Sequence, residues 1–353
     1  MLKKLFYKTI QLCLLLIVIN FIYTKWFYEN DIQKYSELIN TVRDVPNDAD
    51  VIYLGESSNK TSREDDIDKR GISDFIGDYF PNLNTYDITK NAAHAGIYKV
   101  LLENIPAKNQ VNTIIVTLNL RSFDASWIYS GLETPLQKST ILLKKNPPLF
   151  NRFLLSFKVY DIKSEEERVV QFKDKWKNDK LYFEQEHPYK NVIEWDYWMA
   201  TKGAKFTNGV KDQSKTELSC HYVKTYAFHI DTLTNPRIKD FNDIVDLAKE
   251  RNWNLVFNLL AENTSKAKEL VGDELVNMMN INAEMLTQYY ENKGVIVVNN
   301  LNKVEDEEFI DQNWTTEHYA EKGRKIIARN TAIALKKWLK NDFVDVDVNL
   351  ELE

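Results

Sequence analysis

The chain has 353 residues, a length typical of one large domain with an insertion or of two smaller domains. Apolar residues make up 44% of the sequence and aromatic residues 12%, which provides ample material for a core and argues against a disordered protein. The net charge is -6 and no basic stripe occurs, which argues against nucleic acid as a partner.

The first 25 residues carry the clearest compositional signal. Three lysines precede an apolar run over about residues 10–23, long enough with residues 5–7 to cross a bilayer as a slightly short helix. A cleaved signal peptide is the alternative, but no A-x-A-like site follows, and the aromatic triplet at 26–28 is typical of a membrane interface. We therefore predict a transmembrane signal anchor at 1–25. The lysines predict a cytoplasmic N-terminus and a main domain on the exported, periplasmic or extracellular side.

The chain has two cysteines. Cys13 lies within the predicted anchor, so Cys220 has no partner for a disulfide in the exported domain. Apolar residues at helical spacing over 26–48 predict an amphipathic stalk helix that ends at Pro46.

A short apolar strand at 51–54 is followed by Gly55, Glu56 and Ser57. Glycine lets the backbone turn sharply, so Ser57 is expected above the carboxyl end of a sheet, where a histidine could make it a nucleophile. The alternative is an ordinary turn in which Ser57 or Ser58 caps the next helix.

The remaining elements alternate, apart from one segment. Residues 60–75 are expected as a solvated loop, and about 125–240 as a largely helical insertion over the sheet, whose aromatics either line a groove for sugars and acyl groups or form core. Strands are predicted at 83–88, 113–118, 255–260 and 295–298, helices at 72–79, 98–105, 244–248, 267–289 and 320–338, and an acidic tail at 341–353. Five short strands separated by helices predict an α/β fold with a parallel sheet covered on both faces, as one domain over 49–340.

The histidines point to acid–base chemistry and not to a metal. The sequence has no HExxH, CxxC or paired-histidine motif and no Gly-rich phosphate loop, so we expect neither a metal nor a cofactor. His318 follows the last predicted strand and precedes the last helix, at the same sheet edge as Ser57. There it could take the serine proton, although ordinary polar contacts near a helix start are the alternative.

Acyl transfer also needs hydrogen-bond donors for the oxyanion. We expect these from the side chain of Asn119, which follows the third strand, and from the backbone N–H groups of Gly96 and Ser57.

These residues resemble a known family. Gly55-Glu56-Ser57 is similar to the Gly-Asp-Ser start of the SGNH (GDSL-type) hydrolases, and Gly96, Asn119 and His318 fall in the order of that family's later blocks. The segment 315–319, with Gly323 and Arg324, resembles the membrane-anchored, exported branch, which includes proteins of alginate O-acetylation and the D-alanyl transfer protein of teichoic acid synthesis. The resemblance covers about 50–123 and 241–340. It implies a three-layer, flavodoxin-like fold and a membrane-bound O-acyltransferase as partner.

The sequence departs from that pattern at the acid. The family's acid lies three residues before the histidine, where this chain has Thr315, and a threonine cannot stabilise an imidazolium by charge. Asp311 is a possible substitute; otherwise a Ser57–His318 dyad operates, or the enzyme is impaired. Arg121, close to Asn119, could bind an anionic sugar or carboxylate, or form a surface salt bridge.

The sequence therefore predicts a serine esterase or O-acyltransferase acting on an O-acylated cell-envelope polysaccharide. The alternative is a non-catalytic protein of the same fold that binds glycan or serves as a scaffold for an acyltransferase.

Overall fold

The computed structural model describes residues 2–106, 108–144, 146–179, 181, 183 and 186–346. A five-stranded parallel sheet forms its centre, with the strand order β2-β1-β3-β6-β7. The strands are β1 (Val51–Gly55), β2 (Thr85–Thr89), β3 (Thr113–Leu118), β6 (Asn254–Leu259) and β7 (Ile296–Asn299). Counted among themselves they run 2-1-3-4-5, which is the flavodoxin-like order, so the predicted fold class is confirmed.

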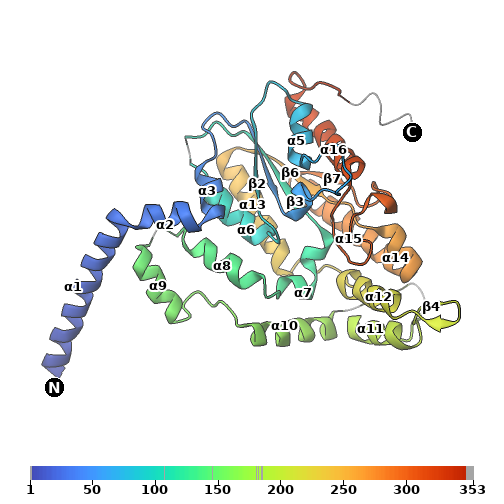
Figure 1. Cartoon of the computed structure of the whole chain (residues 1–353), viewed down its shortest axis with the longest axis horizontal. Coiled ribbons are helices and arrows are strands. Elements are labelled where there is room, and N and C mark those ends of the chain that lie inside the picture. The colour runs from blue at the N-terminus through green and yellow to red at the C-terminus, as the bar shows by residue number, and fades with distance from the viewer. Residues whose placement is uncertain are drawn as a thin grey trace.

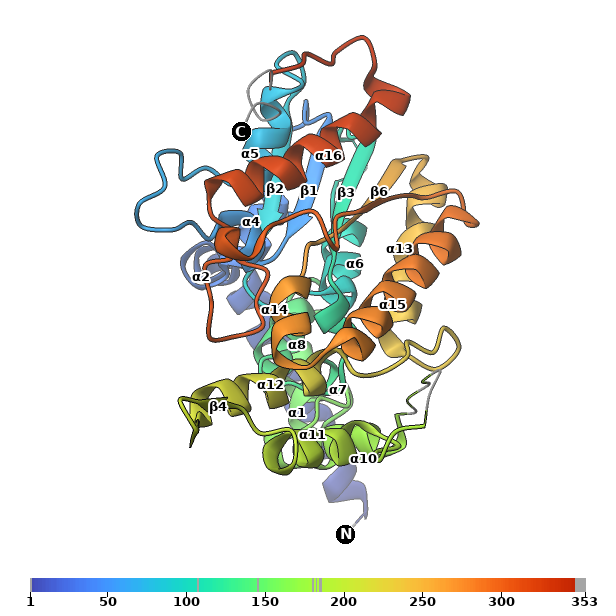
Figure 2. The ribbon, with the colours of Figure 1, turned by 90° about the vertical axis from the view of Figure 1, so that its right-hand side faces the viewer.

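Helices cover both faces of this sheet. One face carries α5 (Ile72–Asp78) and α16 (Glu321–Leu339), which lie side by side in Figure 2. The other carries α6 (Ala95–Glu103), α13 (Pro236–Arg251) and α15 (Asp273–Glu291), with α14 (Thr264–Leu270) before it. The prediction of one helix over 267–289 is wrong at its start, because Gly272 adopts φ +128° and separates α14 from α15.

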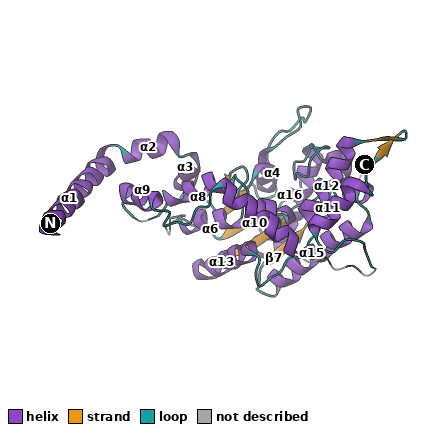
Figure 3. Ribbon diagram, turned by 90° about the horizontal axis from the view of Figure 1, so that it is seen from below, coloured by secondary structure: helices purple, strands orange, loops and turns teal. Residues whose placement is uncertain are grey.

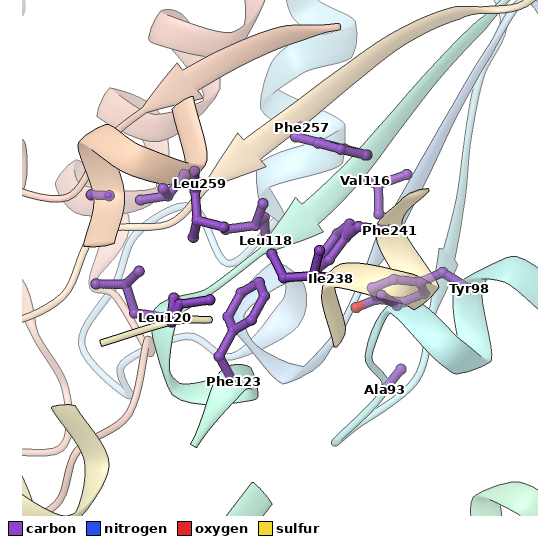
Figure 4. Packing of buried hydrophobic residues seen from close by; sticks show 14 of the residues in the cluster. Ala93, Tyr98, Val116, Leu118, Leu120, Phe123, Ile238, Phe241, Phe257 and Leu259 are labelled. Atoms are coloured by element: carbon purple, nitrogen blue, oxygen red, sulfur yellow. The ribbon is translucent and has the colours of Figure 1, made fainter. Parts of the chain in front are cut away.

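Side chains of the central strands alternate between two cores. Ile52 and Leu54 point into the larger core, whereas Val51 and Tyr53 point into the smaller one under α5 and α16. Figure 4 shows the larger core near the ends of the strands, where Phe123, Ile238 and Phe241 meet Leu118. Every residue of β1 and β3 is buried, as expected for strands covered on both faces.

The N-terminal helix α1 (Leu2–Trp26) projects from the body of the molecule (Figure 1). It is the one described helix long and apolar enough to cross a membrane, and none of its most apolar window is buried. The predicted stalk differs from the structure: α2 (Tyr28–Tyr35) and α3 (Glu37–Arg43) break at Ser36, and Ile32, Leu38 and Val42 pack into the domain.

The segment 125–240 is largely helical. It contains α7 (Ala125–Ile128), α8 (Glu133–Ile141), α9 (Pro148–Ser156), α10 (Glu165–Asn178), α11 (Val192–Thr201) and α12 (Gln213–Tyr226), and the small hairpin β4 (Phe206–Thr207) and β5 (Val210–Lys211). Figure 3 shows this segment from below, where α10 lies in front of the strands of the sheet. Trp195 is 1% exposed and belongs to the same core as β3, so the largest fully buried aromatic of this segment serves packing.

Two terminal or loop predictions need correction. The loop expected to be solvated, 60–75, follows α4 (Ser57–Lys60) and is only partly exposed. Asp66 is buried in an ion pair with Arg324, whereas Ile67 is 98% exposed. The start of the expected tail is packed, because Phe343 stacks on Tyr79; residues 347–353 lie outside the described residues.

Candidate active site

The first strand ends in a turn that requires glycine. A Cβ on Gly55 would lie 2.8 Å from the Tyr53 ring and 3.0 Å from the Asn59 Cβ, closer than real contacts allow. The chain then enters α4, whose first residue is Ser57. The Ser57 N–H is therefore in the first turn of a helix, where the backbone has no intrahelical acceptor for it.

A closed loop holds the histidine. Phe309 and Tyr319 form an antiparallel bridge, and the Ile310 N–H donates to the His318 carbonyl at 2.9 Å. This pairing folds the segment 309–319 back on itself and brings Asp311 next to His318 although seven residues separate them. In the family pattern the acid lies three residues before the histidine. Here the folded-back loop brings an acid that lies seven residues before the histidine to the same ring.

Ser57, His318 and Asp311 form one hydrogen-bonded line. The Ser57 Oγ lies 2.9 Å from His318 Nε2, and His318 Nδ1 lies 2.6 Å from Asp311 Oδ2. The Thr316 hydroxyl donates to the same carboxylate oxygen. The carboxylate therefore favours the tautomer with a proton on Nδ1, which leaves Nε2 as an acceptor toward the serine.

Asn119 directly follows β3, which pairs with β1 in parallel, so it lies at the same end of the sheet as Ser57. Asn119 Oδ1 accepts from the Ser122 N–H at 2.9 Å, which fixes the orientation of the amide and leaves its NH₂ group to donate elsewhere.

Gly96 differs from the other expected donors. Its N–H donates to His94 Nδ1 at 3.2 Å, and a Cβ at this position would meet Asp240 on α13. His94 Nε2 in turn lies 2.7 Å from Glu133 Oε1. Burial and the charge of Arg237 lower the pKa of His94 to about 4, so its ring is neutral near pH 7.

Arg121 holds the histidine loop from inside the protein. It is 4% exposed, donates to the Thr315 carbonyl at 2.7 Å, and forms an ion pair with Glu317. Its guanidinium also stacks 4.4 Å from the centre of the Trp127 ring. Arg121 does form a salt bridge, but the expectation that it lies on the surface is wrong, because the pair is buried. Thr315, which occupies the family's acid position, has a structural role through its backbone carbonyl.

A second carboxylate completes this buried cluster, and no pattern in the sequence indicates it beyond a polar residue after β6. Glu262 is 1% exposed and accepts from the Tyr226 hydroxyl at 2.6 Å. Burial raises its pKa to about 7, against the effects of Tyr226 and Arg121. Burial likewise raises the pKa of Glu317 well above its usual value, while Arg121 opposes the rise. One arginine thus faces two buried carboxyl groups. Its ion pair with Glu317 keeps that carboxyl charged, and a proton on Glu262 then balances the charge of the cluster.

Glu56 lies between this cluster and the serine. It is 3% exposed, and its Oε2 lies 3.1 Å from the Ser57 Oγ, so it competes with His318 Nε2 for the one hydroxyl proton. Together with Asn119 and Arg121 it lines a cavity of about 20 Å³, which is room for one water molecule.

A larger groove of about 690 Å³ is lined by α12 residues and by Asn313 and Trp314 from the histidine loop. Trp314 is 49% exposed, and its ring lies 3.8 Å from that of His221, centre to centre. His221 of α12 therefore contacts the loop that carries His318. Among the described residues, no group of acidic, histidine and cysteine side chains is arranged to hold a metal ion.

Comparisons with known proteins give little beyond this geometry. No protein-family model matches the chain, and no curated protein matches it. Among solved structures it is similar to a protein from Bacteroides fragilis described as a "putative acylhydrolase", with 10% identity over 88% of this chain and 97% of that one, at a TM-score of 0.36. A likeness at this level carries no argument about activity.

Proposed function

We propose that this chain is a membrane-anchored serine esterase or O-acyltransferase of the SGNH type. The observation that supports the proposal is the line from Ser57 through His318 to Asp311, with 2.9 Å and 2.6 Å between successive atoms. Both distances are within the reach that proton transfer requires. In this proposal Ser57 is the nucleophile, His318 the general base, and Asp311 the group that orients the imidazole.

The reaction proceeds in two halves. His318 Nε2 accepts the hydroxyl proton as Ser57 Oγ attacks the ester carbonyl, and the imidazolium then gives that proton to the departing alcohol. The acyl group stays on Ser57 until water or a sugar hydroxyl attacks it; His318 takes the proton of this second nucleophile and returns it to Ser57 Oγ as the acyl–serine bond breaks. Hydrolysis and transfer differ only in this second nucleophile.

The oxyanion would be stabilised by donors at the carboxyl ends of β1 and β3. The Ser57 N–H and the Asn119 side-chain NH₂ are the two donors we propose. The Gly96 N–H would join them only after it released the His94 ring, to which it is bonded at 3.2 Å. Glu56 faces Ser57 Oγ and would hold the hydroxyl before substrate binds.

We propose a cell-envelope glycan as the substrate, with the 690 Å³ groove as its binding surface. The half-exposed Trp314 ring offers an apolar face for a sugar next to the catalytic loop. A Trp314→Ala variant should bind an O-acetylated oligosaccharide several-fold more weakly and hydrolyse a small aryl ester as before. Equal losses on both substrates would exclude this role of the groove.

The proposed location rests on α1. A helix of 25 residues, long and apolar enough to cross a membrane and with three lysines before its apolar run, is consistent with an anchor whose N-terminus is cytoplasmic. The domain would then act on the exported side, where a membrane-bound O-acyltransferase could supply the acyl group.

A fluorophosphonate probe tests the nucleophile. The wild type should be labelled and Ser57→Ala should not. Ser58→Ala is the matched control, because the Ser58 hydroxyl is buried without a hydrogen-bond partner and its removal should leave labelling intact. An unlabelled wild type would instead favour the alternative, a glycan-binding or scaffold protein. The missing acid was the main argument for that alternative, and the position of Asp311 weakens it.

A further inference from the structure

We propose that α9 is a second membrane contact, an interfacial helix whose phenylalanine face enters the surface of the bilayer that α1 crosses. The inference rests on the proposed anchoring by α1. It gives the insertion of the fold, residues 125–240, a lipid-facing surface in addition to the anchor α1.

Helix α9 presents large apolar side chains to solvent. Phe150 and Phe153 are each 48% exposed, and Phe157, directly after the helix, is 67% exposed. The three rings form a continuous row, with centres 6.4 Å and 4.7 Å apart. Their spacing of three and four residues places them on one helical face, and an exposed apolar face of this kind marks an interaction site.

Two hydrogen bonds fix the position of the phenylalanine face of α9 along the axis of α1. The Tyr28 hydroxyl donates to the Leu142 carbonyl at 3.2 Å, and the Leu149 N–H donates to Asn20 Oδ1 at 3.0 Å. Tyr28 belongs to the aromatic triplet expected at the membrane surface, whereas Asn20 lies about 9 Å further along α1 from Trp26, toward the membrane centre. Between the two contacts the chain therefore descends to a depth of about 9 Å, and interfacial helices bury their apolar face by about 5–10 Å.

The charge of the segment fits an anionic lipid surface. Residues 142–163 hold five basic side chains and one acidic one, a net charge of +4 in a chain of net charge -6. Basic groups beside an apolar helix face are typical of interfacial helices, because long side chains can reach the headgroups while the rings lie deeper.

The buried polar side chain on the inner side of α9, Asn151, has its hydrogen-bond partners within the protein. Asn151 is 3% exposed, donates to the carbonyls of Ile141 and Asn146 at 3.3 Å each, and accepts from the Tyr160 hydroxyl at 2.7 Å. Polar groups satisfied within the protein are what a segment at membrane depth requires. A lipid surface is therefore the occupant that accounts for the rings, their depth and the charge together.

Spin labels on the full-length chain in lipid-only vesicles of anionic and neutral phospholipids test this. Cys13→Ala and Cys220→Ala remove both native thiols, and single labels are then attached at Phe153→Cys in α9, Ile17→Cys in α1 and Ile67→Cys in the loop after α4. At Phe153 and Ile17 the label should collide several-fold more often with oxygen than with a water-soluble nickel chelate. At Ile67, which is 98% exposed on the domain, the order should be reversed.

The pattern of the three labels separates the failures. Oxygen contact at Ile17 with nickel contact at Phe153 would leave the anchor in place and overturn the inference, as expected if the rings serve a protein partner. Nickel contact at both positions would overturn the anchor and the inference together. In a Phe150→Ser/Phe157→Ser background, loss of the oxygen excess at Phe153 with no change at Ile17 would support insertion by the phenylalanine face itself.

Discussion

Asp311 is the residue on which the proposed mechanism depends most directly. Its carboxylate lies 2.6 Å from His318 Nδ1, and it shares the oxygen with the Thr316 hydroxyl. In a Ser-His-Asp arrangement the acid holds the imidazole tautomer and stabilises the imidazolium. The Asp311 side chain is 37% exposed, so water can replace part of that stabilisation.

We therefore expect Asp311→Asn to lower kcat by about 10²–10⁴-fold with little change in KM. Thr315→Val is the matched control, because Thr315 occupies the family's acid position but contributes its backbone carbonyl to Arg121. Steady-state hydrolysis of an aryl ester measures both. A kcat of Asp311→Asn within a few-fold of the wild type would show that a Ser57–His318 dyad suffices.

The approach of Ser57 to His318 was predictable from the sequence, whereas Asp311 could be named there only as a possible acid. Ser57 comes two residues after β1, and His318 lies in the connection from β7 to α16, so the parallel topology brings both to one edge of the sheet. Asp311 approaches His318 only because Phe309 pairs with Tyr319, and no periodicity in the sequence signals an isolated bridge. The Arg121–Glu317 ion pair joins residues nearly 200 positions apart, so it likewise could not be predicted from any local pattern in the sequence.

Glu262 makes the stability of the fold depend on pH. Its folded-state pKa of about 7 lies above its ordinary value of 4.5, so the folded protein binds more protons than the unfolded chain between these values. The stability that this proton contributes is fully present below pH 4.5 and is lost as the pH rises through 7. The shift corresponds to about 3 kcal/mol.

A Glu262→Gln variant should remove this dependence. Glutamine keeps an acceptor for the Tyr226 hydroxyl and carries no charge, so the variant should match the wild type at pH 5 and be more stable at pH 8. Thermal unfolding across this range measures the difference, with the exposed Glu284→Gln on α15 as control. A variant that is less stable than the wild type at pH 8 would show that the charged carboxylate stabilises the fold.

At the scale of elements, Arg121 connects η1 (Leu120–Phe123), which follows β3, to the loop of His318. Arg121→Met should lower the free energy of unfolding by about 3–5 kcal/mol, because Glu317 would be left buried without its partner. The same change removes the donor to the Thr315 carbonyl and should also lower kcat.

The double variant Arg121→Met/Glu317→Gln separates the two effects. It should regain most of the stability, because no unpaired charge remains, while kcat stays low, because the loop still lacks its arginine contact. Urea unfolding and ester hydrolysis on the same samples give both quantities. Full recovery of kcat in the double variant would mean that Arg121 acts through stability alone.

Element prediction succeeded where periodicity was strong. β3, with its run of β-branched residues, was predicted with the bounds observed, Thr113–Leu118, and the helix over 320–338 closely matches α16. The stalk was predicted as one helix because its apolar spacing continues through Ser36, and a break at a single polar residue leaves that spacing unchanged. The inserted helices lack a regular pattern because much of their surface packs on other inserted helices.

At the scale of the whole molecule, the inserted helices share the core of the sheet. Trp195 stacks on Tyr189 with ring centres 4.7 Å apart, in the same buried cluster as Val116 of β3 and Phe257 of β6. A segment that contributes to a common core cannot unfold without exposing it, so we expect the insertion and the α/β domain to unfold together as one cooperative unit.

Trp195→Ala should therefore destabilise the whole domain by about 3–5 kcal/mol. Far-UV circular dichroism and tryptophan fluorescence should report the same urea midpoint, lowered equally for both signals. Tyr197→Ala is the matched control on the same helix, because Tyr197 is 71% exposed and its removal leaves no cavity. If Trp195→Ala instead produced an early fluorescence transition while the circular dichroism midpoint stayed that of the wild type, the inserted helices would be an independent folding unit. The groove beside Trp314 would then lie between two separately folding parts, because α12 supplies one wall and the His318 loop the other.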